Sequence, residues 1–462
     1  MLPAAPLSFH DLYKAWQSAR RRKRPSHNQL AFEAVWLDSL SALVQRVNSG
    51  AWWPSPPVCF ITTRPKAREI HAPDFADRVL HHWLVPRLEA LWEPDFIFDS
   101  FSNRAGKGTH AAVARLQHHM RALQSGSGRG QAHYLQLDIQ NFFNSVHRPT
   151  LYRQLVGKLE KKGPRHYTDE LLHSLRWLCH RLLARAPAAQ VQWRASPHER
   201  ALVPAHKRLA QAAPGCGLPI GNLTSQFFAN VYLDALDQFV KHHLKCQHYV
   251  RYVDDFVLLH HDPAQLRAWQ VEIEGFLAER LRLTLKPQIL RGAVQQGVDF
   301  LGYHVFPHHL TVRPRVLVHA HQRLAQLHAE MQLPALRATV ASYWGHFSHA
   351  SAHKARRQLC RAHPWLHLWF ATPEQVAPLW RQPPQGATRL RHQLQWLREQ
   401  FPRATLRVQR GLGREELPGH PDSVVWVREA GRLASGLRER VVAGGRRLRG
   451  AKRFSVFSRR LS

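Results

Sequence analysis

The sequence is short of acidic residues, and no long apolar run interrupts it. Only 32 Asp and Glu stand against 65 Lys and Arg, which gives a formal charge of +33. Such an excess of one sign opposes compaction unless a polyanion screens it, so nucleic acid is the expected partner. With 462 residues and 44% hydrophobic content, the chain can bury an ordinary core. Its length predicts roughly two to four structural units.

Cysteine is also scarce, and the five that are present, at positions 59, 179, 216, 246 and 360, include no close pair. This spacing argues against a zinc motif and a disulfide framework, and it favours a reduced, cytoplasmic setting. No apolar run approaches the ~20 residues of a membrane span, and the N-terminus lacks a signal-peptide layout, so no membrane partner is expected. Histidine pairs such as His319 and His321 lack Cys or carboxylate partners at ligand spacing, which favours polar surface roles over a zinc site.

Two of the scarce acids stand side by side in HYVRYVDDFVLLHH (248–261). The flanking residues are typical of buried strands, in which neighbouring side chains point to opposite faces. Asp254 and Asp255 therefore converge on one site only if the chain turns there, and the segment predicts a β-hairpin with both at its bend. Like charges this close repel unless a divalent cation neutralises them. For an isolated acid pair, a surface turn is the alternative.

A third acid, Asp138, lies in the apolar segment HYLQLDIQNFFNSV (133–146), which has the pattern of a central strand. Its burial would be costly without a cation or a donor. On a strand beside the acid pair, it would complete a site of hard oxygen ligands suited to Mg²⁺. Two such ions roughly 3.5–4 Å apart activate an attacking hydroxyl and stabilise a leaving pyrophosphate. The three acids therefore predict nucleotidyl transfer.

The segments before these strands are basic and helical. Residues 1–48 predict two helices joined by a basic loop, whose cations are candidates for phosphate contacts, with a solvated loop as the alternative. These cations are Arg20, Arg21, Arg22, Lys23 and Arg24. A strand at 58–63 leads into a predicted basic hairpin and a helix at 77–92. NRAGKGTH (103–110) lacks the first Gly and the hydroxyl of a Walker A loop, so a turn before a helix is expected instead.

The segments after Asp138 alternate between basic, glycine-containing and helical patterns. A basic, proline-bearing insertion covers about 183–216. Gly217 and Gly221 predict a tight loop, and Thr224 or Ser225 is expected to cap the amphipathic helix that follows. LRLTLKPQ (281–288) and GVDFLGYHVF (297–306) predict short strands. Helices are expected from about residue 311, then a separate unit with a helix at 387–401, a strand at 423–427 and a basic tail.

Five of these segments, in their order and spacing, resemble the palm motifs of reverse transcriptases. They are LDIQNFFNSV, GLPIGNLTSQFFANVYLDALDQF, YVRYVDDFVLL, LTLKPQ and VDFLGYHVF, and the pair within YVDD is that family's active-site signature. The resemblance spans roughly residues 50–350. It implies an α+β right-hand polymerase whose palm is an antiparallel sheet with helices. The implied domains are an N-terminal basic segment (1–50), fingers (51–132), palm (133–306), helical thumb (307–370) and a C-terminal appendage (371–462).

The resemblance also implies roles for individual residues. Asp138 and Asp254 would hold two Mg²⁺ ions, for which Mn²⁺ is an alternative, with support from Asp255 and the carbonyl of Ile139. Phe143 matches the aromatic steric gate that clashes with a 2′-hydroxyl, although either Phe142 or Phe143 could instead belong to the core. The implied nucleotide-binding residues are Lys66 and Arg68 of the fingers hairpin, Ile220, Gly221 and Gln226 of the loop, and Lys286, which would protonate pyrophosphate.

The form IGNLTSQ (220–226) has Ile220 where retroviral enzymes have glutamine, which puts base-pair checking in doubt. It is similar to the form in diversity-generating retroelements, whose enzymes make errors at template adenines, and in related antiviral enzymes. The expected partners are template RNA, the RNA/DNA duplex, dNTPs and a small basic accessory protein of the retroelement. The alternatives are an antiviral reverse transcriptase, a non-catalytic RNA-binding scaffold on a polymerase-like fold, and an RNA-dependent RNA polymerase.

Overall fold

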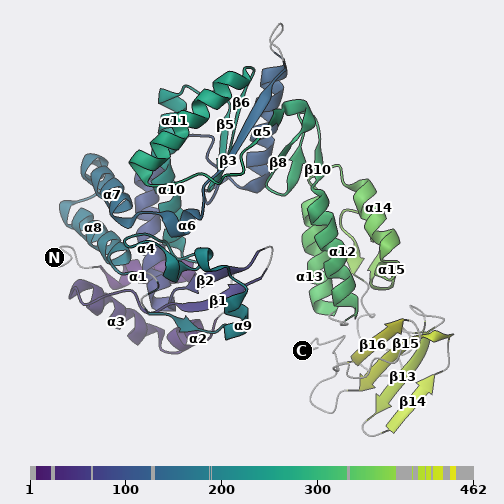
Figure 1. The fold of residues 1–462 in the computed structure, drawn as a ribbon. Coiled ribbons are helices and arrows are strands. Elements are labelled where there is room, and N and C mark those ends of the chain that lie inside the picture. The colour runs from purple at the N-terminus through teal and green to yellow at the C-terminus, as the bar shows by residue number, and fades with distance from the viewer. Residues whose placement is uncertain are drawn as a thin grey trace. The chain divides into compact units, whose positions relative to one another are not determined.

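The computed structural model contains helices and sheets in two compact units (Figure 1), Met1–Gln296 and Gly297–Ser462. The division between them falls ten residues before the predicted end of the palm at 306 (306 − 296). The mixture of helices and antiparallel strands confirms the predicted α+β class. The structure describes residues 7–21, 26–63, 66–125, 131–186, 188, 190–329, 333–380, 398, 404–410, 413–417, 420–429 and 437–443.

The N-terminal helices form where the sequence predicts them, with one additional break. The second predicted helix is two, because Val35 leaves helical geometry at φ −130° and ψ 48°. Trp16 and Trp36 stack face to face at 5.2 Å between ring centroids, which joins the first helix to the third. The helices are α1 (Phe9–Arg20), α2 (His27–Ala34), α3 (Trp36–Asn48) and α4 (Phe75–Trp92).

The predicted basic hairpin is present as β1 (Val58–Thr62) paired antiparallel with β2 (Arg68–Ala72). The basic insertion contributes a third strand that the sequence did not reveal, β4 (Gln192–Trp193), parallel to β1. This strand is two residues long, which is too short for any periodicity to show. Around it lie α8 (Asp169–Ala184), α9 (Pro197–Ala201) and short 3₁₀ turns at Ala205–Lys207 and Leu209–Gln211.

A four-stranded antiparallel sheet in the order β5-β6-β3-β7 carries the acids. Its strands are β5 (Tyr249–Tyr252), β6 (Asp255–His260), β3 (His133–Asp138) and β7 (Leu290–Ala293), and the helices packed against it are α5 (Thr109–Gln124) and α11 (Pro263–Leu281). One strand prediction was too long, and another was wrong. The strand predicted over 133–146 ends at Asp138, and that over 281–288 contributes only an isolated bridge between Ile139 and Leu285.

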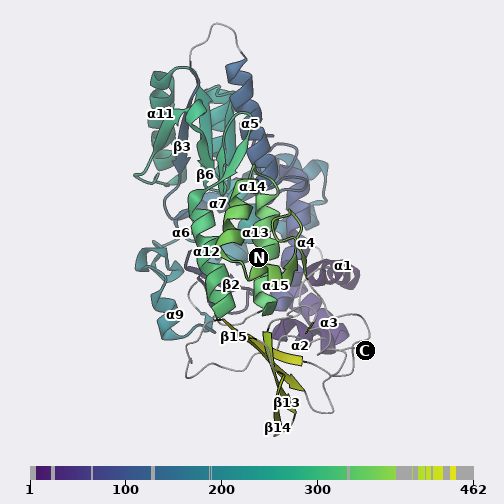
Figure 2. The ribbon, with the colours of Figure 1, turned by 90° about the vertical axis from the view of Figure 1, so that its right-hand side faces the viewer.

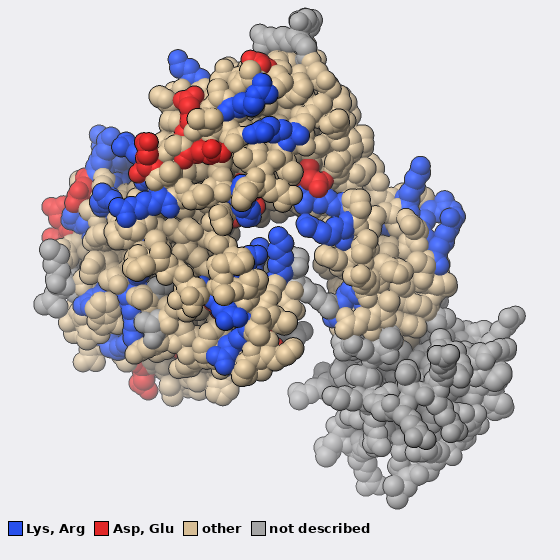
Figure 3. All heavy atoms as spheres, viewed as in Figure 1, with Lys and Arg blue, Asp and Glu red and all other residues tan. Residues whose placement is uncertain are grey.

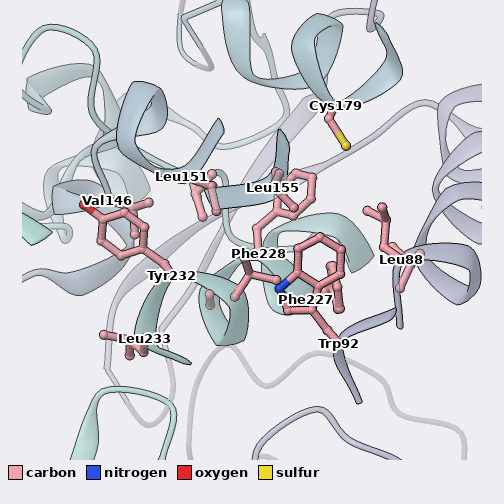
Figure 4. Close-up of a cluster of buried hydrophobic side chains, with 14 of the residues drawn as sticks. Leu88, Trp92, Val146, Leu151, Leu155, Cys179, Phe227, Phe228, Tyr232 and Leu233 are labelled. Carbon is pink, nitrogen blue, oxygen red and sulfur yellow. The ribbon is translucent and has the colours of Figure 1, made fainter. Parts of the chain in front are cut away.

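The core of the first unit forms where three helices meet. Leu88 and Trp92 of α4, Leu151 and Leu155 of α7 (Arg148–Lys162) and aromatic rings of α10 (Leu223–Gln238) interdigitate (Figure 4). The predicted cap of α10 was wrong. Thr224 and Ser225 lie inside the helix and are buried, and Asn222 takes the N-cap position without a side-chain capping bond. A π-helical segment, Phe239–His243, continues α10.

The second unit contains the predicted C-terminal helices and strands. The hairpin β8 (Val298–Phe300) and β9 (Tyr303–Val305) pairs with β10 (Leu310–Val312) in a separate three-stranded sheet, and the helices are α12 (Pro314–Ala329), α13 (Leu333–Phe347), α14 (His353–Ala362) and α15 (Leu366–Trp369). The short strands β11 (Phe370–Ala371) and β12 (Leu379–Trp380) pair with each other. The remaining strands are β13 (Ala404–Arg410), β14 (Gly413–Leu417), β15 (His420–Glu429) and β16 (Leu437–Ala443).

The strand predicted at 423–427 is confirmed within β15. The helix predicted at 387–401 and the basic tail lie outside the described residues, apart from the helical Arg398. Among the helices that the structure describes, none combines the length and the apolar character needed to cross a bilayer.

Buried histidine makes the first unit sensitive to acid. His81 of α4 is 2% exposed, and burial lowers its pKa from 6.5 to about 3. Between these two pH values His81 is protonated in the unfolded chain but stays neutral in the folded state. The stability that neutral His81 contributes is therefore lost as pH falls from 6.5 towards 3. We expect His81→Gln to lose less stability between pH 7 and pH 4 in thermal melts, by up to about 1.4 kcal/mol per pH unit. The exposed His308→Gln is the control, and identical slopes for both variants would contradict the expectation.

Candidate active site

The predicted hairpin bend is present, and it places Asp254 in the turn. β5 and β6 pair antiparallel, with Tyr252 opposite Asp255, so that Val253 and Asp254 alone connect the strands. Val253 adopts φ +57°, in the left-handed region that β-branched residues disfavour. Asp255 is the first residue of β6. The two adjacent acids therefore differ in location, because Asp254 lies in the turn and Asp255 lies in the sheet.

The third predicted acid lies on the neighbouring strand. β3 pairs with β6 in a register that sets Asp138 opposite Asp255, and the Ile139 amide donates to the Asp254 carbonyl at 3.2 Å. Burial, and next to it the charge of Asp138, raise the pKa of the Asp254 carboxyl from 3.8 to about 6. The carboxylates of Asp138 and Asp254 thus lie close enough to repel each other.

Asp255 is engaged differently from the other two acids. Because cross-strand partners share a face of the sheet, its side chain emerges on the same face as Asp138. There its Oδ1 accepts a hydrogen bond from Gln136 Nε2 at 2.9 Å. Within the described ranges, no three His, Cys, Asp or Glu side chains are grouped so that they could hold a metal ion. The structure therefore brings together Asp138 and Asp254, with Asp255 beside them in the sheet.

Gln136 was missed by the sequence reasoning. The signal for it was its position two residues before Asp138 on the same strand face, where its 8% exposed side chain meets the acid of the neighbouring strand.

The paired acids fit a divalent cation. The Oδ1 atom of Asp138 is buried and has no hydrogen-bond partner among the described residues, although a buried carboxylate oxygen normally has one. Its other oxygen, Oδ2, is contacted by the ammonium group of Lys286, which therefore occupies one of the two oxygens of this carboxylate. Lys286 also donates its backbone amide to the Asp138 carbonyl at 2.8 Å. Hard oxygen atoms with unsatisfied negative charge are the ligands that Mg²⁺ and Mn²⁺ prefer.

The two phenylalanines after β3 have different environments. Asn141, at φ +46°, ends the extended chain and starts a short helix, α6 (Phe142–Ser145). Phe142 is 2% exposed and belongs to the core, whereas Phe143 is half-buried at its edge, and their rings meet edge to face at 5.4 Å. The backbone carbonyl of Phe143 accepts from the Leu218 amide at 2.7 Å. The helix thus assigns one ring to the core and leaves the other partly exposed.

The loop at 217–222 joins the predicted gate to the hairpin. Beside the Leu218 contact, the Ile220 carbonyl accepts from the His71 amide of β2 at 2.7 Å. Gly221 has φ +121°, and a Cβ there would lie 3.0 Å from the His71 carbonyl oxygen, so the site requires glycine. Ile220 is half-buried, and Gln226 is exposed in the first turn of α10.

The predicted phosphate-binding cations fall at two places. Arg68 starts β2 and is exposed, and its charge is the smallest of the influences on Asp254, where it opposes the rise of that residue's pKa. Lys66 is exposed just before β2. At the other place, Arg20 ends α1, where it pairs with Glu33 at 3.2 Å and lies 4.6 Å from the centroid of the Trp16 ring.

Of the other predicted phosphate-binding cations of the N-terminal segment, Arg21 is exposed, and Arg22, Lys23 and Arg24 lie outside the described residues. Lys and Arg outnumber Asp and Glu across the face drawn in Figure 3.

Residues 62–305 match the family model described as reverse transcriptase (RNA-dependent DNA polymerase). This match covers more than half of the chain and contains the acidic turn, Phe143 and the loop at 217–222. The chain belongs to the reverse transcriptase family. The family is that of RNA-directed DNA polymerases, which are nucleotidyltransferases that use divalent metal ions. The α+β architecture described above is its right-hand polymerase fold.

Individual relatives of this reverse transcriptase are distant. The protein YkfC of Escherichia coli K12 is 21% identical over 312 residues, which cover 60% of this chain and 73% of that protein. A truncated apo telomerase from Candida tropicalis has a TM-score of 0.40 at 12% identity, over 61% of this chain and 60% of its own. Telomerase from Candida albicans, solved with a fragment of telomeric RNA, has a TM-score of 0.39 at 10% identity, over 79% and 75%. Similarities this low carry no information on substrate.

Proposed function

We propose that this reverse transcriptase makes DNA on an RNA template, with Asp138 and Asp254 at the reacting phosphates. The observation that carries the proposal is the pair itself. One acid has a buried oxygen without a hydrogen-bond partner among the described residues, and the other has a pKa raised to about 6 by burial and by its neighbour. Two acids that repel each other are costly unless they bind a cation, and the chain is otherwise rich in cations that attract nucleic acid.

The acids would hold two Mg²⁺ ions, with Mn²⁺ as an alternative, and these ions would activate the primer hydroxyl and offset the charge of the leaving pyrophosphate. Asp138 and Asp254 supply the carboxylates, and the Ile139 carbonyl lies next to Asp138 in the chain. Asp255 supports the site from the sheet through Gln136. In this proposal Asp138 and Asp254 bind the ions, and Asp255 supports the site.

The surrounding residues would orient the nucleotide. Lys66 and Arg68 of the hairpin are exposed cations that would neutralise the triphosphate. Phe143 would lie under the sugar. Lys286 pairs with Asp138 Oδ2 and has to leave that oxygen to donate a proton to pyrophosphate. Ile220 and Gly221 would line the nucleotide, since their loop contacts both the proposed gate and the hairpin, and Gln226 would do so from the first turn of α10.

A primer-extension assay tests the proposal. A primer annealed to RNA is incubated with the full chain and Mg²⁺, and either dNTPs or NTPs are supplied. We expect extension with dNTPs only. Extension with NTPs instead would indicate an RNA-dependent RNA polymerase, and the absence of product with both, while RNA is still bound, would indicate a non-catalytic scaffold.

We propose the same domain limits that were expected from the sequence. The N-terminal helices (1–50) precede the fingers (51–132), the palm (133–306) contains the four-stranded acid-bearing sheet, and the thumb (307–370) contains α12 to α15. No function is proposed for residues 371–462. Template RNA and the RNA/DNA duplex would bind mainly through phosphate contacts, so binding should weaken steeply with salt.

We further propose that the enzyme serves a diversity-generating retroelement and makes errors at template adenines, with a small basic accessory protein as partner. An enzyme of antiviral defence is the second candidate. The proposal depends on Ile220, which replaces the glutamine of retroviral enzymes in a loop held against β2. A neighbouring pair of template and variable repeats in the DNA would separate the two candidates.

Ile220→Gln is expected to raise fidelity, because an amide at this position can make polar contacts with the incoming nucleotide that an aliphatic side chain cannot. Sequencing of cDNA made on a defined RNA template measures the errors at adenines, and Ile220→Leu controls for the loss of the β-branched shape. An error spectrum that both variants share with the parent would count against the role of Ile220.

A further inference from the structure

A fully buried ion pair lies directly behind the catalytic turn. Arg251 of β5 is 1% exposed and stands three residues before Asp254. Its Nε and Nη2 atoms donate to Oδ1 and Oδ2 of Asp237 at 2.7 and 2.6 Å. Asp237, near the end of α10, is 0% exposed and also accepts from the hydroxyl of Tyr249 at 2.8 Å. The two-bond geometry fixes the plane of the guanidinium.

Stability alone does not account for this pair. Removing two charges from water costs so much that well-packed apolar residues of similar volume are often as stabilising. The guanidinium also makes hydrogen bonds that apolar residues cannot, one of them long, to Asn230 Oδ1 at 3.5 Å. Its Nη1 atom donates to the backbone carbonyl of Val253 at 3.0 Å. Asp237 therefore holds Arg251 so that it presents a fixed donor to the turn.

Val253 is the residue that needs to be held. Its φ of +57° is unfavourable for a β-branched side chain, and it directly precedes Asp254. A return of Val253 to negative φ would redirect the chain at the acid. The donor itself is anchored, because the Arg251 amide donates to the Asp99 carbonyl at 2.9 Å and its carbonyl accepts from Phe101 at 3.0 Å. The strained residue, Val253, therefore lies between an anchored strand and Asp254.

We propose that Arg251, oriented by Asp237, is a positioning residue that keeps the Val253 carbonyl in place and so sets the direction from which Asp254 meets a divalent cation. The inference rests on the proposed function, because it concerns the same acid. It assigns a purpose to a buried charge pair that lies outside the three predicted catalytic acids.

The test separates the bracing of the Val253 carbonyl by Arg251 from the contribution of the ion pair to stability. It removes the charges of Arg251 and Asp237 together, so that neither is left unpaired. In the apolar variant, Arg251→Met, Asp237→Leu and Tyr249→Phe are combined. A second variant adds Val253→Gly, because glycine adopts positive φ without strain and needs no brace. Arg251→Lys is the milder third variant, because a single ammonium group cannot reproduce the fork that bonds both Asp237 oxygens and the Val253 carbonyl.

The direct readout is the affinity of the full chain for Mn²⁺ alone, measured by electron paramagnetic resonance without nucleotide or primer. Thermal melts follow stability, and the Mg²⁺ concentration for half-maximal primer extension is the second readout. We expect the apolar variant to melt near the parent and to bind Mn²⁺ at least tenfold more weakly. Adding Val253→Gly should restore most of that affinity, and Arg251→Lys should lose several-fold.

Parental Mn²⁺ affinity in the folded apolar variant would overturn the inference, as would a failure of Val253→Gly to restore it. If the apolar variant does not fold, Arg251→Lys decides, and unchanged affinity there overturns the inference too. Asp77→Asn is the matched control, since Asp77 is a buried acid that accepts from Trp52 and Ser55 far along the chain from the turn. It should alter the melt and leave Mn²⁺ affinity unchanged. A parent that binds Mn²⁺ but incorporates no dNTP would refute the proposed function and leave this inference standing.

Discussion

Asp254→Ala is expected to lower primer extension by at least on the order of a thousandfold, because it removes one of the two carboxylates that we propose lie at the reacting phosphates. RNA binding should persist, since phosphate contacts elsewhere on the basic surface supply it. The melting temperature should stay the same or rise. Burial and the charge of Asp138 raise the pKa of Asp254 to about 6, which means that the folded state disfavours its ionised form at neutral pH.

The control for this change is Glu279→Ala, which removes an exposed acid of α11 and should leave extension close to that of the parent. Primer extension at saturating dNTP, RNA binding and thermal melts are measured on all three proteins. If Asp254→Ala still extends primers at nearly the parental rate, the acids do not form the catalytic site.

Phe143→Ala is expected to admit ribonucleotides. In the proposed gate role, this half-buried ring would clash with a 2′-hydroxyl, and its removal should lower the preference for dNTP over NTP by roughly tenfold to hundredfold. The ratio of kcat/KM for a dNTP and the matching NTP on one primed RNA template measures the effect. The fold should survive, since Phe143 lies at the edge of the core.

The chain offers a matched control in the preceding residue. Phe142 has the same side chain in the same helical turn but is 2% exposed within the core. Phe142→Ala should cost about 3–5 kcal/mol of stability and leave sugar selectivity unchanged. The opposite result, with selectivity lost in Phe142→Ala and kept in Phe143→Ala, would show that the gate is Phe142 and not Phe143.

Much of the acidic site was predictable because its signals are local. The short apolar runs on both sides of Asp254 and Asp255 are typical of buried strands, and two adjacent acids between such strands converge only if the chain turns there. The same reasoning predicted the basic hairpin at β1 and β2. It failed for the segment after Asp138, where the apolar pattern continues but Asn141 enters a left-handed conformation that starts a helix.

Other features depend on partners far away in the chain. Gln136 was overlooked because its role exists only once β3 lies beside β6 and its amide meets Asp255. Arg251 is part of the sequence YVRYVDD, but a charged residue in a strand does not indicate burial by itself. Its burial follows only when Asp237 of α10 is placed against it. The strand β4 pairs with residues more than a hundred positions earlier, which no periodicity of two residues can signal.

The sequence by itself determined which residue types are available for chemistry: three carboxylates flanked by apolar segments, an aromatic residue five positions after the first, and an excess of positive charge that attracts nucleic acid. Only the tertiary structure decided which acids face each other, which phenylalanine is exposed and how the strained turn is held. The physical reason is that side-chain type and period are local properties of the chain, whereas repulsion between carboxylates, burial and the pairing of charges depend on residues that folding alone brings together.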